Sequence, residues 1–210
     1  MRYLYLHGFA SGPRSTKGVA FEKHYAARGI RIERLDLRVP SFDHLRLSAM
    51  IDTVRAELGS TDEPAVLIGS SLGGLTAAHV AVGDKRIKGL VLLAPAFGLV
   101  GRWREQLGPA WDEWQRSGWR QVTDYTTGQP ARIDFGFVED VGRIDRGLPP
   151  IECATLILHG RRDETVPIDG SRELAKLNAH VRLVELDDGH ELVASLPAIL
   201  AETDVFLAGV

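Results

Sequence analysis

The chain has 210 residues, of which 44% are hydrophobic and 25% are charged, close to the average composition of soluble globular proteins. Its formal charge of −3, with no long run of one sign, gives a nucleic acid or an anionic membrane no electrostatic advantage as a partner. The single cysteine, Cys153, excludes an intramolecular disulfide bond. We therefore expect one main domain that is held by packing and binds a small neutral or weakly charged molecule.

Features of export and of membrane insertion are not found in the sequence. The strand-like start at residues 1–7 is not preceded by a basic leader or an apolar stretch. No apolar run approaches the roughly 18 residues that span a bilayer. A lone cysteine is compatible with a reducing compartment. The sequence therefore favours a cytoplasmic protein without a membrane partner, and it does not indicate the oligomeric state.

Short apolar runs alternate with longer stretches of helical periodicity, which is the pattern of a parallel sheet covered by helices on both faces. Six strands are predicted at residues 2–7, 31–37, 65–70, 89–94, 154–159 and 181–186. Helices are predicted at residues 15–28, 43–58, 72–82, 168–178 and 191–207. Asp43 is expected to accept hydrogen bonds from the first turn of its helix, and Gly29 and Gly59 to adopt left-handed conformations after helices.

One long segment interrupts this alternation. Residues 97–150 separate the fourth strand from the fifth, so the α/β core is predicted to comprise residues 1–96 and 151–210. A connection of this length is usually functional or has structure of its own, and we interpret it as a lid. It contains all four tryptophans: Trp103, Trp111, Trp114 and Trp119. Trp103, Trp111 and Trp114 are candidates for a substrate pocket, although any one of them could simply fasten the insertion to the core.

The most informative motif is Gly69-Ser70-Ser71-Leu72-Gly73-Gly74, which follows a predicted buried strand and opens a predicted helix. This is the context of a G-x-S-x-G nucleophile elbow, with Ser71 at its centre. Gly69 and Gly73 lack a Cβ and so leave room for a tight turn that strains the backbone of the serine. The helix start behind the hydroxyl favours developing negative charge. Ser70 is not expected to react. The alternative is a glycine-rich turn of structural use only.

A serine hydroxyl needs a base, and the base needs a group that holds its tautomer. In this class of fold the chain order is serine, acid, histidine. After Ser71, the histidines are His79, His159, His180 and His190. His79 is in the elbow helix and His159 is in a strand, so neither has much freedom to reach the hydroxyl. His190 directly follows the last predicted strand, at the edge where parallel strands present their loops, and we predict it to be the base.

The acid should follow a strand between the serine and the base, and Asp163 follows the fifth predicted strand. The turn after the fourth strand, residues 94–97, contains no carboxylate. Glu164 is adjacent but would point elsewhere. Asp187 and Asp188 could serve only if the last loop folded back, and a solvated turn is their simpler role. Asp163 is therefore the predicted acid.

An acyl-transfer enzyme also needs donors for the oxyanion, normally two backbone amides. The amide of Leu72 directly follows the predicted nucleophile. The second donor should come from the glycine-flanked turn after the first strand, where Phe9 lies between Gly8 and Ala10. We predict the amides of Phe9 and Leu72 for this role. His7 is interpreted as a structural residue that braces the turn.

Taken together, these motifs resemble those of the α/β-hydrolase superfamily over nearly the whole chain. They are His-Gly-Phe at 7–9, the elbow at 69–74, His-Gly-Arg-Arg-Asp at 159–163 and Gly-His at 189–190. Within that superfamily, residues 4–17 and the double-serine elbow resemble the small bacterial YqiA-type esterases. This resemblance implies a carboxylester hydrolase with a trimmed sheet. The tryptophan-rich insertion departs from those proteins, and the substrate depends on it.

We therefore expect a serine hydrolase that cleaves a small ester or thioester through an acyl-enzyme, without a metal or cofactor. Two alternatives come from other classes. A non-catalytic homologue could keep the same residues, bind a small molecule and signal through its lid. A dinucleotide-binding oxidoreductase is suggested only by the first glycine turn and by Asp36, since Gly8 and Gly12 do not complete a G-x-G-x-x-G motif.

Overall fold

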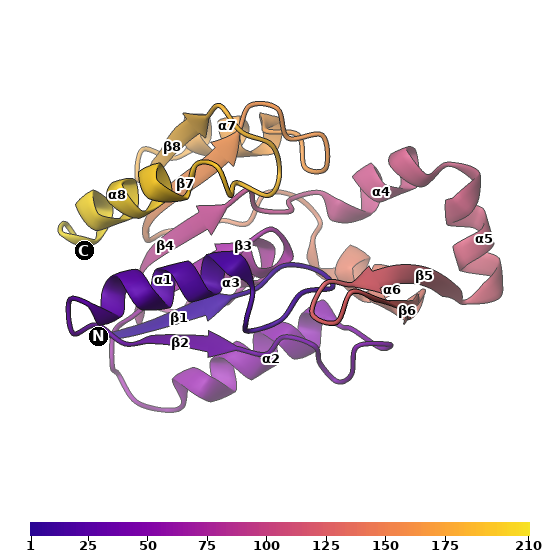
Figure 1. Ribbon diagram of the computed structural model, residues 1–210, viewed down its shortest axis with the longest axis horizontal. Helices are drawn as coiled ribbons and strands as arrows, with labels where there is room; N and C mark the ends of the chain where they lie inside the picture. The colour runs from indigo at the N-terminus through magenta and orange to yellow at the C-terminus, as the bar shows by residue number, and fades with distance from the viewer.

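A six-stranded parallel sheet forms the centre of the protein in a computed structural model that describes residues 1–210 (Figure 1). Its strands lie in the order β2-β1-β3-β4-β7-β8, and every pairing between neighbours is parallel. Their bounds are β1 Arg2–Leu6, β2 Ile32–Leu35, β3 Ala65–Ser70, β4 Ile87–Leu93, β7 Ala154–Gly160 and β8 Val181–Leu186. The predicted six-stranded α/β sheet is confirmed.

Helices cover both faces of the sheet because its central strands are apolar on both sides. The five core helices are α1 Thr16–Ala26, α2 Leu47–Leu58, α3 Leu72–Ala81, α7 Asp169–Leu177 and α8 Leu196–Leu207. Alternate residues of β3 belong to two separate apolar clusters. Leu67 packs with residues of α2 and α3, whereas Val66 and Ile68 pack with residues of α1 and α8. These two clusters fill the space between the sheet and its two helix layers.

Two predicted helices begin later than the periodicity indicated. Asp43 does not cap α2, which starts at Leu47 without a side-chain cap. The preceding loop is instead held by the insertion, because Asp134 forms an ion pair with Arg46 at 2.7 Å and donates its amide to the carbonyl of Asp43. Gly29 and Gly59 do take positive φ angles, 73° and 65°, after α1 and α2.

The last helix, predicted to begin at Glu191, begins at Leu196. Leu192 has a φ of 55°, which a helix cannot accommodate. The Ser195 amide donates to the Asp188 carboxylate at 2.9 Å, and Pro197 occupies the start of α8, where proline is favoured. Residues 191–195 therefore form a turn that holds the preceding loop in place.

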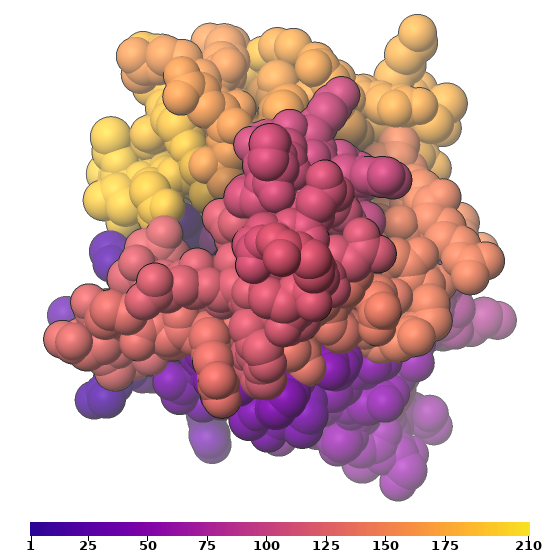
Figure 2. Space-filling model, turned by 90° about the vertical axis from the view of Figure 1, so that its right-hand side faces the viewer, coloured from indigo at the N-terminus to yellow at the C-terminus, as the bar shows by residue number.

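The segment 97–150 has secondary structure of its own. It contains α4 Leu99–Leu107, α5 Pro109–Ser117, the antiparallel hairpin of β5 Trp119–Asp124 and β6 Gln129–Asp134, and α6 Gly136–Ile144. Figure 1 shows α4, α5 and the hairpin beyond the carboxyl ends of the parallel strands. In Figure 2 the rose-to-salmon insertion crosses the middle of that end of the molecule. The insertion thus covers the edge at which the predicted site residues emerge.

Backbone and side-chain contacts attach this insertion to the core. The Tyr125 amide, at the hairpin tip, donates to the carbonyl of Ala10 at 2.8 Å. At the other end of the insertion, the Asp140 carboxylate on α6 accepts from the amide and the hydroxyl of Ser48 at 2.8 and 2.9 Å.

None of the protein's helices combines the length and the apolar run that crossing a bilayer requires.

Candidate active site

Ser71 lies at the sharp turn between β3 and α3, with φ 52° and ψ −113°. Its amide donates to the carbonyl of Leu93 at the end of β4, and its carbonyl accepts from the amides of Leu75 and Ala96. A non-glycine residue with a positive φ is strained unless its surroundings hold it. Here the neighbouring strand, the helix and the turn after β4 hold Ser71 from three sides.

The glycines of the motif allow α3 to approach the sheet. A Cβ on Gly73 would overlap the carbonyl oxygen of Leu6 in β1, and a Cβ on Gly69 would overlap the carbonyl oxygen of Gly73. A Cβ on Gly8, after β1, would lie 3.5 Å from the Cβ of Ser71. The turn after β1 therefore passes directly beside the serine.

Gly73→Ala is expected to destabilise the fold by about 2 kcal/mol or more, because the new methyl group pushes α3 away from β1. Urea denaturation followed by circular dichroism measures this loss. Gly101→Ala in α4 is the matched control, since a Cβ there meets no atom within 4 Å. The control should gain about 0.5–1 kcal/mol, as alanine favours a helix more than glycine does. Equal stability of the two variants would contradict close packing at Gly73.

A chain of hydrogen bonds links the three residues predicted for catalysis. His190 Nε2 lies 3.1 Å from Ser71 Oγ, and His190 Nδ1 lies 2.7 Å from Asp163 Oδ2. Ser71 comes from the turn after β3, Asp163 from the turn after β7 and His190 from the turn after β8. The structure thus brings these residues together, in the arrangement in which a carboxylate orients a histidine toward a hydroxyl.

Further contacts hold Asp163 in its ionised form. Burial opposes ionisation, but hydrogen bonds from His159, His190 and the Val166 amide outweigh it, so the pKa of Asp163 is well below its usual value. The amides of Thr165 and Val166 donate to its Oδ1 at 2.9 and 2.7 Å. His159 Nε2 lies 3.2 Å from the same Oδ2 that faces His190.

From the sequence alone, His159 is excluded as the base and is assigned no other role, so its contact with Asp163 is missed. The ring is fully buried in β7, with Nδ1 2.8 Å from the Ser171 hydroxyl and Nε2 2.8 Å from the Val166 carbonyl. A neutral ring that donates from Nε2 satisfies the carbonyl and the carboxylate together. A buried histidine four residues before the predicted acid was the available signal.

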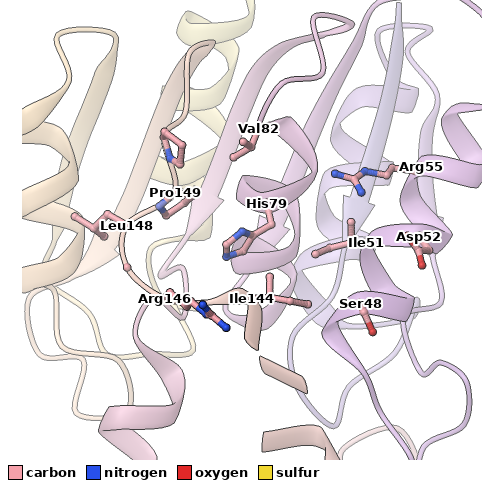
Figure 3. A pocket seen from close by; sticks show the side chains of 12 residues that line it. Ser48, Ile51, Asp52, Arg55, His79, Val82, Ile144, Arg146, Leu148 and Pro149 are labelled. Carbon is pink, nitrogen blue, oxygen red and sulfur yellow. The ribbon is translucent and has the colours of Figure 1, made fainter. Parts of the chain in front are cut away.

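The remaining histidines lie elsewhere. His79 lines a separate hollow of about 570 Å³ on the α2 and α3 side, where Figure 3 shows its ring among Ile51, Ile144 and Arg146. His180 lies 2.7 Å from the Ile151 carbonyl. His7 has Nδ1 2.9 Å from the Gly8 carbonyl and accepts the Leu37 amide at Nε2, so it braces the turn after β1 as expected.

Other carboxylates near the site have different partners. Asp187 is 82% exposed and pairs with Arg162, which is the solvated-turn role expected for it. Asp188 accepts the Gly189 and Ser195 amides and so holds the loop that carries His190. Asp36 is bound through both carboxylate oxygens by Arg38, at 2.8 and 2.6 Å. No group of three or more potential metal-ligating side chains is present.

A cleft of about 660 Å³ opens over Ser71 and His190. Phe9 and Leu72, whose amides were predicted to bind an oxyanion, both line it. Its other apolar walls are Ala96, Leu99, Trp103, Val166 and Val193, and the polar and charged lining includes Arg14, Lys17, Arg102, Tyr125 and Glu191. The turn after β1, the elbow, α4 and the loop after β8 thus enclose one space beside the serine.

The three candidate tryptophans occupy different positions. Trp103 lines the cleft and contacts Phe9, with ring centroids 5.1 Å apart. Trp114 is buried, donates from Nε1 to the Ile133 carbonyl and lines only an adjoining hollow of about 270 Å³. Trp111 lies away from both hollows because its ring packs against Phe135 and Trp114. Trp111 and Trp114 thus fasten the insertion, and only Trp103 reaches the cleft.

The parallel sheet, the strained serine turn and the loops at the carboxyl edge define a member of the α/β-hydrolase superfamily. The model of one protein family matches residues 2–201. The chain belongs to this family, UPF0227, which is described as an uncharacterised protein family.

Relatives and solved structures agree with the α/β-hydrolase fold. Palmitoyl-protein thioesterase ABHD10, mitochondrial, from Mus musculus is 26% identical over 183 residues, which are 82% of this chain and 62% of the relative. The matched chain thus spans less than two thirds of that relative's length. Mouse alpha/beta hydrolase domain-containing protein 10 superposes with a TM-score of 0.82 at 22% identity, covering 99% of this chain and 89% of the other.

A structure of Est1E from Butyrivibrio proteoclasticus with ferulic acid bound gives a TM-score of 0.79 at 20% identity, covering 99% of this chain and 88% of the other. These likenesses confirm the predicted fold. The name of the ABHD10 relative includes the word mitochondrial, and the cytoplasmic location expected for this chain stays a prediction.

Proposed function

We propose that this protein is a serine hydrolase that cleaves carboxylic esters or thioesters through an acyl-enzyme. The observation that carries the proposal is the uninterrupted series of hydrogen bonds from Ser71 through His190 to Asp163, placed at the floor of a cleft. In this assignment Ser71 is the nucleophile, His190 is the general base and acid, and Asp163 holds His190 in the tautomer that accepts at Nε2.

The reaction has two halves. Ser71 Oγ attacks the carbonyl carbon while its proton passes to His190 Nε2, and the amides of Phe9 and Leu72 stabilise the oxyanion. The bond from carbon to the leaving oxygen or sulfur then breaks, and His190 returns the proton to the leaving group. Water, deprotonated by His190, next attacks the acyl-serine, and His190 gives this proton to Ser71 Oγ as the bond from the acyl carbon to Oγ breaks and the carboxylic acid leaves.

The names of similar proteins and the walls of the cleft both bear on the substrate class. The thioesterase name of the ABHD10 relative favours a thioester, and the ferulic acid bound to Est1E favours an ester of an aromatic acid. Apolar side chains, among them Phe9, Leu99 and Trp103, supply a wall for an acyl chain. The same three catalytic side chains serve both leaving groups, so the proposal includes esters and thioesters.

Covalent labelling tests the proposal directly. A fluorophosphonate should add one adduct to the protein, and peptide mass spectrometry should place it on Ser71 because this hydroxyl faces His190 within the cleft. Ser70→Ala should label like the wild type and Ser71→Ala should not label. An adduct on another residue, or none on the folded wild type, would contradict the assignment. Labelling without steady-state turnover of any ester would instead support a non-catalytic homologue.

A further inference from the structure

The cleft carries more positive than negative charge, although the whole chain carries −3. Three cationic side chains line it, from Arg14, Lys17 and Arg102, and Glu191 is the one carboxylate in the lining. Arg14 lies just before α1, Lys17 lies in the first turn of α1, and Arg102 comes from α4. Positive charge therefore enters the cleft from two separate parts of the chain.

None of these cations has a carboxylate oxygen within 4.0 Å. Lys17 Nζ donates to the main-chain carbonyl of Glu191 at 2.7 Å. Arg102 Nη1 donates to the main-chain carbonyl of Phe97, also at 2.7 Å. Most arginines elsewhere in the chain form ion pairs, as Arg46 does with Asp134. Lys17 and Arg102 are thus held in place by carbonyls, and none of the three charges is neutralised by an ion pair.

Arg102 differs from the other two cations in the hydrogen bonding of its guanidinium. Its Nε is buried and has no hydrogen-bond partner. Burial lowers the pKa of Arg102, and the charges of Asp145 and Asp163 offset this only in part. Asp145 forms no ion pair with Arg102: its Oδ2 accepts the Leu99 amide, and its buried Oδ1 has no hydrogen-bond partner and lies 3.9 Å from His79 Nε2.

A guanidinium in this state is incompletely solvated by the protein. An unpaired N–H that is removed from water costs free energy until an acceptor arrives, and hydrogen bonds between charged groups are the strong ones. The same side chain lines the cleft in which Ser71 Oγ and His190 meet. An anionic group on a bound molecule would complete the hydrogen bonding of Arg102 and balance the positive charge of the cleft.

We propose that the substrate carries a carboxylate or phosphate group that binds Arg102, and that Arg102 is a specificity-determining residue. The inference rests on the proposed function and narrows its substrate class from esters and thioesters in general to anionic ones. Lys17 and Arg14 extend the positive potential along the cleft and attract such a substrate. The net charge of the whole chain led us to expect a neutral or weakly charged ligand. The lining of the cleft has the opposite sign of charge and therefore favours an anionic ligand.

Matched esters of equal size test this preference in the wild type. On the acyl side, mono-4-nitrophenyl adipate is compared with its neutral adipamide analogue. On the leaving-group side, 4-(butanoyloxy)benzoate and 4-(butanoyloxy)phenyl phosphate are compared with 4-(butanoyloxy)benzamide. In at least one series kcat/KM should be about tenfold or more higher for the anionic ester. The series that responds identifies which side of the substrate carries the anion. No preference in any series would overturn the proposal.

Variants of Arg102 separate recognition from structural support. In Arg102→Gln the ratio of kcat/KM for the anionic ester to that for its neutral partner should fall about tenfold, and Arg102→Lys should retain part of the ratio. Arg104→Gln is the matched control, since Arg104 is an exposed residue of the same helix outside the cleft lining. A purely structural arginine would lower both rates equally and leave the ratio unchanged, which would overturn the proposal.

Fluorophosphonate labelling keeps this test separate from that of the proposed function. Wild type and Arg102→Gln should both label at Ser71, because the probe needs only the nucleophile and its base. If Ser71 labels but the wild type shows no charge preference, the specificity proposal fails while the hydrolase proposal stands. If Ser71 does not label, the proposed function itself fails.

Discussion

Ser71→Ala is expected to lower kcat/KM for 4-nitrophenyl butyrate by about 10⁴-fold to 10⁶-fold at neutral pH, while leaving the fold intact. The physical reason is that His190 Nε2, 3.1 Å from the serine hydroxyl, has no other nucleophile to activate at that position. A residual rate remains because the oxyanion donors and the cleft still bind the substrate. Steady-state release of 4-nitrophenolate measures the loss.

The neighbouring serine supplies a closely matched control for this variant. Ser70→Ala removes a hydroxyl from the same turn, but Ser70 ends β3 with its side chain buried. We expect this variant to stay within roughly tenfold of the wild-type rate, since its hydroxyl does not face His190. If the two alanine variants lost activity to the same extent, strain in the turn rather than nucleophilic attack would explain the Ser71 result.

The core of the fold could be predicted because its central strands are buried on both faces. Runs such as residues 65–70 are apolar on both sides of the strand, and only a sheet between two helix layers buries both. Helix starts were predicted less well. Asp43 looked like a cap in the sequence, but the tertiary pair of Arg46 with Asp134 holds that segment as a loop, and no local pattern encodes a pair 88 residues apart.

The hairpin of β5 and β6 was missed for a related reason. Its strands alternate only weakly, because most of their side chains are half-buried or exposed. Ile133 is its one fully buried apolar residue, and it belongs to the same apolar cluster as Leu67 of β3. The remaining signal in the sequence was Gly128, which takes a positive φ of 71° in the turn between the strands.

The meeting of Ser71, Asp163 and His190 could be predicted because each follows a parallel strand, and the carboxyl ends of such strands share one edge. Arg102 could not be singled out in this way. Arg102 stands out because its Nε is buried and has no hydrogen-bond partner, and this environment exists only once the insertion is packed. The tryptophans show the same limit, since composition gathers them in one segment but packing alone separates Trp103 from Trp111.

Asp163→Asn is expected to lower kcat by roughly 10⁴-fold at neutral pH, although the substitution changes the side-chain volume very little. The amide can still accept the Thr165 and Val166 amides through its oxygen, so its NH₂ group then faces His190 Nδ1. The imidazole must respond by carrying its proton on Nε2, where it can no longer accept the proton of Ser71. Steady-state ester hydrolysis by the folded variant measures the loss.

Asp187→Asn is the matched control, because this carboxylate is 82% exposed and has no contact with His190; little change in kcat is expected.

The stability of the protein gives an independent check on Asp163. The pKa of Asp163 is lowered in the folded state. Its stabilising contribution is therefore present above the ordinary pKa near 4 and is lost as the pH falls toward the pKa of the folded state. The difference in unfolding free energy between wild type and Asp163→Asn should therefore shrink on acidification. A difference independent of pH would mean that Asp163 acts through packing and not as a carboxylate that orients His190.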